Sequence, residues 1–94
     1  MRLSEIEKSA IIEAVTRVDL NARIYLFGSR ADDSKKGGDI DILIFSKHLT
    51  FDDKLKIKAW IFEKIEEQKI DIVIAKDARD PFVKMIQEQG VEFK

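Results

Sequence analysis

Cysteine is absent from this 94-residue sequence, and histidine, tryptophan, tyrosine and proline each occur once. The absence of cysteine excludes a disulfide framework, a thiolate nucleophile and a cysteine-type zinc site. The single proline and four glycines, with 45% hydrophobic and 37% charged residues, are typical of a compact domain rather than a disordered or repeat chain. A chain of this length buries somewhat over ~60% of the surface that it exposes when unfolded. We therefore expect residues 1–94 to form a single domain with one core.

The chain also lacks a charge excess and a long apolar run. Its formal net charge is -1, whereas proteins that bind nucleic acids usually concentrate basic residues on one face. No apolar stretch approaches the ~20 residues needed to span a bilayer, and the amino terminus lacks the basic-then-apolar pattern of a signal peptide. We therefore expect a cytoplasmic protein without a membrane partner and with no strong nucleic-acid signal.

Periodicity predicts three helices, over residues 4–20, 50–68 and 80–90. Capping-box spacings open the first two, at Ser4 and Thr50, and Asp80-Pro81 opens the third, which Gly90 ends. The residues expected to face the core are Ile6, Ala10, Ile11, Ala14, Val15 and Val18 in the first helix, Leu55, Ala59, Ile61, Phe62 and Ile65 in the second, and Phe82, Met85 and Ile86 in the third.

Three runs rich in β-branched residues, 22–27, 39–45 and 69–75, predict strands between these helices. The short polar link between the first two strands favours antiparallel pairing, and the helical crossover from the second to the third favours parallel pairing. The expected fold class is therefore α/β or α+β, with a small mixed β-sheet covered by helices.

Two aspartates, Asp39 and Asp41, open the second of these strands. A strand sends alternate side chains to opposite faces, so both carboxylates project together and repel each other. Asp71 lies on the similarly patterned third strand. If the two strands are neighbours, the three carboxylates converge as oxygen ligands for Mg²⁺, a cation that often also binds substrate phosphates. The alternative is that these acids form only the solvent-facing side of half-buried strands.

Gly28 and Ser29 stand where the first strand gives way to a turn, a position in which backbone N–H groups can hold phosphate oxygens. Because glycine has no side chain, a phosphate can approach its backbone closely. Arg30 adds a permanent, forked positive charge that matches phosphate oxygens. Taken alone, the pair also fits an ordinary strand-ending glycine followed by a helix cap.

Together these features resemble the nucleotidyltransferase superfamily whose fold is shared with DNA polymerase β. The segments Leu26–Ala31 and Gly38–Leu43 resemble most closely the minimal nucleotidyltransferase (MNT) group of small prokaryotic proteins, and the resemblance covers nearly the whole chain. Two positions depart from the family pattern. Asp32 stands where glycine is frequent, and Gly38 stands where serine commonly precedes the acidic pair.

The resemblance implies the transfer of AMP from ATP to a hydroxyl group. Gly28 and Ser29 would hold the β and γ phosphates, and Arg30 would help to neutralise the departing pyrophosphate. Asp39 and Asp41 would bind two Mg²⁺ ions, and Asp71 would complete the site of the ion that activates the acceptor. Members of this group resemble antitoxins paired with helical HEPN ribonuclease toxins, so the implied acceptor is a tyrosine of such a partner.

Two other functions remain open at this point. The chain could act as a stoichiometric antitoxin or binding subunit that does not catalyse, or as a structural module whose strand acids have no ligand. A homo-oligomer is also possible, since symmetric dimers are common. His48 is interpreted as an exposed spectator. Phe51, Trp60 and Phe62 could form a base-stacking platform, but core packing is the preferred interpretation for Phe62, and Trp60 is expected at a rim or interface.

Overall fold

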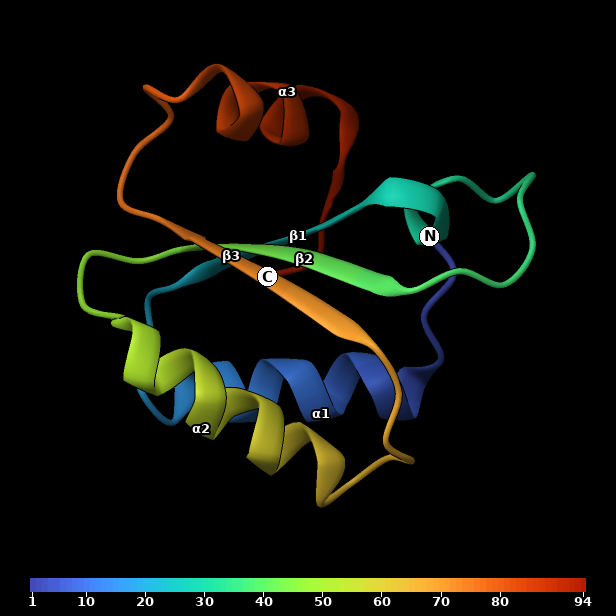
Figure 1. Ribbon diagram of the computed structural model, residues 1–94, viewed down its shortest axis with the longest axis horizontal. Helices are drawn as coiled ribbons and strands as arrows, with labels where there is room; N and C mark the ends of the chain where they lie inside the picture. The colour runs from blue at the N-terminus through green and yellow to red at the C-terminus, as the bar shows by residue number, and fades with distance from the viewer.

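The computed structural model describes residues 1–94 as a four-stranded sheet between two layers of helices (Figure 1). The elements in chain order are α1 (Glu5–Thr16), β1 (Arg23–Phe27), the 3₁₀ helix η1 (Gly28–Ala31), β2 (Ile40–Phe45), α2 (Phe51–Phe62), β3 (Ile70–Ala75), α3 (Pro81–Gln89) and β4 (Val91–Glu92). Helices α1 and α2 cover one face of the sheet, and α3 covers the other (Figure 1). The predicted α+β class and helix-covered mixed sheet are confirmed. No helix has the length and apolar character that a membrane crossing requires.

The strands lie in the order β3-β2-β1-β4. As predicted, β1 pairs antiparallel with β2, and β2 pairs parallel with β3. The end of β1 and the starts of β2 and β3 therefore meet at one end of the sheet. The two-residue strand β4, antiparallel to β1 at Tyr25 and Leu26, was not expected from the sequence, because two residues are too few to show an alternating pattern.

The predicted caps form at all three helices. Ser4 and Thr50 make capping boxes with Glu7 and Asp53, and the Asp80 side chain accepts a hydrogen bond from the backbone N–H of Phe82. The predicted ends of the first two helices were wrong, since α1 ends at Thr16 and α2 at Phe62. Apolar residues continue beyond both ends, but the chain tightens there into turns with three-residue spacing, such as the hydrogen bond from the N–H of Lys64 to the carbonyl of Ile61.

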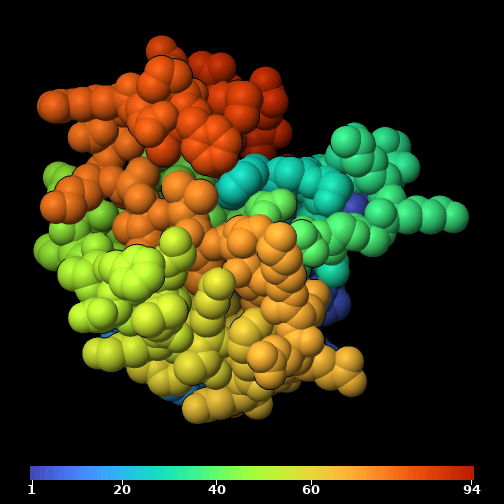
Figure 2. Space-filling model, in the orientation of Figure 1, coloured from blue at the N-terminus to red at the C-terminus, as the bar shows by residue number.

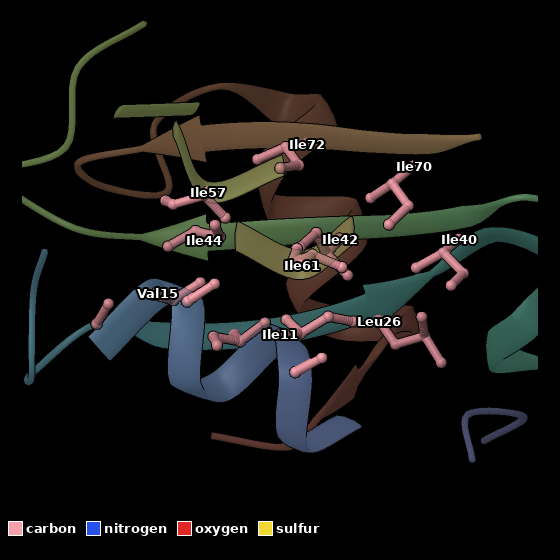
Figure 3. Close-up of a cluster of buried hydrophobic side chains, with 14 of the residues drawn as sticks. Ile11, Val15, Leu26, Ile40, Ile42, Ile44, Ile57, Ile61, Ile70 and Ile72 are labelled. Atoms are coloured by element: carbon pink, nitrogen blue, oxygen red, sulfur yellow. The ribbon is translucent and has the colours of Figure 1, made fainter. Parts of the chain in front are cut away.

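The main core lies between the sheet and the helices α1 and α2 (Figure 3). Alternation along β2 sends Ile40, Ile42 and Ile44 into it, where all three are fully buried against side chains such as Ile11 of α1 and Ile61 of α2. A smaller cluster lies on the other face under α3 and contains Tyr25, Leu43, Val83 and Ile86. The even positions of β2 therefore anchor the strand, and its odd positions face α3.

Periodicity misplaced several helix residues. Ile6, Leu55, Phe82 and Met85 are between 42% and 68% exposed, and Ala59 is also exposed. The buried residues are Ile57 and Ile61 in α2, and Val83 and Ile86 in α3. When apolar residues also flank the buried face of a helix, the hydrophobic period locates that face only to within about one residue.

The three aromatic residues considered as a stacking platform do not form one. Phe62 and Trp60 are partly buried against the main core, as preferred for Phe62, whereas Phe51 is 69% exposed. Trp60 lies at the rim, where the guanidinium carbon of Arg17 is 5.0 Å from its ring centroid.

Candidate active site at one end of the sheet

An acidic pair lies where β2 and β3 begin. Asp41 of β2 is in register with Asp71 of β3, so their side chains are neighbours on the face of the sheet that carries α3. Asp39 lies one residue before β2, although it was predicted to lie within the strand. The Asp39 and Asp71 side chains are 49% and 52% exposed, so both can be reached from solvent. The structure thus places the three predicted acids at one end of the sheet.

The pKa of Asp41 is raised by its surroundings. Burial of its carboxyl raises its pKa, and a hydrogen bond shared with Asp71 and the negative charges of Asp71 and Asp39 raise it further. Lys69 acts in the opposite direction, but its effect is the smallest. A carboxyl held among other carboxyls costs free energy when it ionises, unless a cation neutralises the group.

The Gly28–Ser29 turn lies directly against this pair. Gly28 has a φ of 72°, and a Cβ atom added there would collide with Oδ2 of Asp41. Only glycine fits this approach without strain, because the left-handed region is unfavourable for other residues. In Figure 2, η1 lies next to the start of β2, and the loop that follows it extends away from the body of the molecule. The turn predicted to hold phosphates and the predicted acids therefore lie side by side.

The same close packing accounts for the glycine at position 38. Gly38 has a φ of 90°, and a Cβ there would collide with Oγ of Ser29. The Ser29 hydroxyl therefore occupies the space that a serine at position 38 would need. The other departure, Asp32, turns the loop after η1, because its Oδ1 accepts hydrogen bonds from the backbone N–H and the hydroxyl of Ser34. The first part of that loop is therefore held by side-chain hydrogen bonding, and left-handed Gly37 and Gly38 end it.

Arg30 fastens the turn to the rest of the domain. Its guanidinium donates hydrogen bonds to the carbonyls of Gly38 at 3.1 Å and Arg2 at 3.0 Å, and lies 3.5 Å from the Glu7 carboxylate. Arg2 supports the same turn by donating to the carbonyl of Ser29 at 2.8 Å, a contact that no sequence signal indicated. Arg30 makes its ion pair with Glu7 and none with the three acids, and its contact with a phosphate stays a prediction.

Lys69 is a site residue that the sequence analysis missed. Its Nζ lies 3.5 Å from Oδ2 of Asp39 and 4.0 Å from Oδ2 of Asp71. The available signal was its spacing from Asp71, since two positions along an extended chain bring side chains to the same face.

The largest cavity adjoins the turn. It measures about 640 Å³ and lies between the Phe27–Ser29 segment and the side chains of Met85, Ile86 and Gln89 on α3. This volume is within the range of small-molecule sites, ~300–1,000 Å³. A second cavity of about 320 Å³ lies at the opposite end of β2. It is lined in part by His48, which therefore lies away from the acids.

The acids suit a hard divalent cation by their chemistry. All three offer carboxylate oxygens, the ligands that Mg²⁺ prefers. Burial and the neighbouring charges of Asp71 and Asp39 raise the pKa of Asp41, and a cation would offset this cost of ionisation. As the side chains stand, no three acidic or histidine groups enclose a ready-made cation site. Asp39, Asp41 and Asp71 are the residues that would hold the ion.

The raised pKa of Asp41 predicts a measurable effect on stability. Because the folded-state pKa of Asp41 lies above its unfolded value, ionisation of this carboxyl destabilises the fold above that pKa, and the penalty disappears as the pH falls through it. At pH 7 with a chelator present, Asp41→Asn is expected to raise the free energy of unfolding. The gain should be at most about 1 kcal/mol, because the Asp41 carboxyl is partly solvated. The gain should vanish near pH 3. Thermal unfolding at both pH values checks this, and a variant less stable than the wild type at pH 7 would contradict it.

The sequence comparisons agree with this geometry. A sequence model described as nucleotidyltransferase domain matches residues 8–92, a range that contains the turn, all three acids and α3. No curated protein matches the chain. The match supports the superfamily part of the resemblance and, with it, nucleotidyl transfer as the general activity. The chain therefore belongs to the nucleotidyltransferase domain family.

Proposed function

We propose that this protein transfers AMP from ATP to a hydroxyl group of a partner protein, with Mg²⁺ held by Asp39, Asp41 and Asp71. The observation that carries the proposal is the contact between the two halves of the site: the Gly28 backbone approaches the Asp41 carboxylate so closely that a methyl group would not fit. A triphosphate on this turn would lie beside the carboxylates that hold the cation.

The turn has the backbone geometry of an anion site. Gly28 is left-handed and is followed by the right-handed residues of η1, an alternation that points successive N–H groups into one concavity. The cavity between this turn and α3 is large enough for the nucleoside, with Phe27 and Met85 as apolar walls and Gln89 as a hydrogen-bonding side chain. Phosphates and nucleoside would thus occupy adjoining parts of one depression.

The proposed reaction is an in-line displacement at the α-phosphorus. The acceptor oxygen forms a bond to that phosphorus, the bond to pyrophosphate breaks, and the hydroxyl proton is released. The turn at Gly28 and Ser29 would hold the leaving phosphates. Asp41 and Asp71 would orient the acceptor oxygen and the α-phosphate. Bound Mg²⁺ would supply a lowered pKa of the acceptor hydroxyl and neutralisation of the charge on the pyrophosphate.

The proposed acceptor is a tyrosine of a HEPN ribonuclease toxin, which would make this protein an antitoxin. The support is the resemblance of Leu26–Ala31 and Gly38–Leu43 to the MNT group. The acids are also accessible enough for a side chain of another protein to reach them, because Asp39 and Asp71 are about half exposed.

The test is label transfer. The protein, a cognate HEPN partner and ATP labelled at the α-phosphate are incubated with Mg²⁺ and with EDTA. We expect label on the partner only with Mg²⁺, and none on a partner whose acceptor tyrosine is replaced by phenylalanine. No transfer to a verified cognate partner would contradict the proposal.

The position of Lys69 favours one second candidate, a stoichiometric antitoxin or binding subunit that does not catalyse. Its ammonium already neutralises part of the charge of Asp39 and Asp71. This candidate predicts that the double variant Asp39→Asn, Asp41→Asn still neutralises the partner. If the double variant forms the complex but no longer neutralises the partner, the second candidate is excluded.

A further inference from the structure

Lys69 is the one basic side chain that makes ion pairs with the site acids. It bridges Asp39 and Asp71, at 3.5 and 4.0 Å, from a position two residues before Asp71. The lysine ammonium therefore contacts two of the three carboxylates that, in the proposed function, bind a divalent cation. Both kinds of cation compete for the same oxygens.

The contacts of Lys69 are weak enough to be exchanged. Its side chain is 67% exposed, and the two carboxylates that it contacts are about half exposed. Ion pairs between exposed side chains contribute little free energy, because water and salt screen them. The flexible four-carbon stem of lysine also allows the ammonium to leave the carboxylates while the backbone stays in place.

We propose that Lys69 is a resident counterion of the acidic site, which a divalent cation displaces from Asp39 and Asp71, so that the site favours a nucleotide-borne cation over a free one. This inference rests on the proposed function. A free cation has to overcome the lysine charge, and this opposes its binding. A cation that arrives with a triphosphate brings negative charge for the displaced ammonium, so the same lysine does not oppose its binding.

The test is Mn²⁺ binding measured by electron paramagnetic resonance, which requires no turnover. Free Mn²⁺ is titrated alone and then with the α,β-methylene analogue of ATP. In Lys69→Met, which removes the charge but keeps an unbranched apolar stem, we expect free Mn²⁺ to bind roughly threefold to tenfold more tightly than in the wild type, with no such gain in the presence of the analogue. Lys69→Arg keeps the charge and should behave like the wild type.

The matched control is Lys56→Met. Lys56 is an exposed lysine of α2, on the helix layer opposite the acids, and it makes no ion pair, so this variant changes the net charge equally without touching the site. Thermal unfolding in EDTA gives a second readout. Lys69→Met should melt a few degrees below Lys56→Met, because Asp39 and Asp71 then lack their counterion.

The outcomes separate this inference from the proposed function. If the wild type binds Mn²⁺ with the analogue, but Lys69→Met binds free Mn²⁺ no more tightly than Lys56→Met does, the counterion role is overturned and the proposed function stands. If the wild type binds Mn²⁺ neither alone nor with the analogue, both are overturned.

Discussion

Replacing Asp41 by asparagine is expected to reduce nucleotidyl transfer by roughly 100- to 1,000-fold, the loss typical when one charged or polar group that stabilises a transition state is removed. Asp41 is the central acid of the site, in register with Asp71 on one side and with Phe27 on the other. The amide keeps the shape of the side chain but removes the charge that a cation requires. The measurement is the initial rate of label transfer to the partner.

The matched control for this variant is Glu66→Gln, which makes the same charge change at an exposed position between α2 and β3. It should transfer AMP at the wild-type rate. Asp41→Asn is expected to be at least as stable as the wild type in the absence of metal, and its thermal unfolding checks that the loss of activity does not come from unfolding. Transfer by Asp41→Asn at a rate close to that of Glu66→Gln would contradict the role of this residue.

Replacing Gly28 by alanine is expected to damage both stability and activity. The left-handed backbone costs an alanine about 1–2 kcal/mol in the free energy of unfolding. The new methyl group also collides with Oδ2 of Asp41, which can yield only by rotating away. A displacement on the order of 1 Å at a reacting centre reduces rates roughly 100-fold, so we expect a loss of this size in transfer.

Gly37 provides a control that separates the two effects. It is also left-handed, with a φ of 64°, but a Cβ atom there would meet nothing within 4 Å. Gly37→Ala should therefore share the backbone strain without disturbing Asp41. Denaturant unfolding and label transfer on both variants test this. Equal transfer rates in Gly28→Ala and Gly37→Ala would show that the contact between turn and carboxylate does not matter for the reaction.

The parts of the site that could be predicted from sequence are those set by local chain geometry. The alternation from Asp39 to Ile44 fixes which side chains enter the core, and the short loop between β1 and β2 makes them antiparallel, which brings Gly28 close to Asp41. The register that pairs Asp41 with Asp71 follows from isoleucines that fill the same core in both strands. Local patterns and the requirement for a buried face agree here.

Other features depend on contacts between distant segments, which no local pattern contains. Arg30 was predicted from its residue type to contact a phosphate, whereas in the structure its guanidinium is held by Glu7 of α1 and by the carbonyls of Arg2 and Gly38. Arg2 supports the turn from 27 positions away in the sequence. The strand β4 exists only because the chain after α3 returns to the free edge of β1. These contacts are decided by packing in three dimensions.

The central claim is that a nucleotide and its cation bind together between the Gly28 turn and the acidic pair. It is tested most directly by nuclear magnetic resonance of the ¹⁵N-labelled protein with Mn²⁺ and the α,β-methylene analogue of ATP. Paramagnetic broadening should be strongest at the amides of Gly28, Ser29, Asp41 and Asp71, and should be absent in Asp41→Asn. Broadening centred instead on the cavity at the opposite end of β2, around Lys47 and Lys76, would contradict the account.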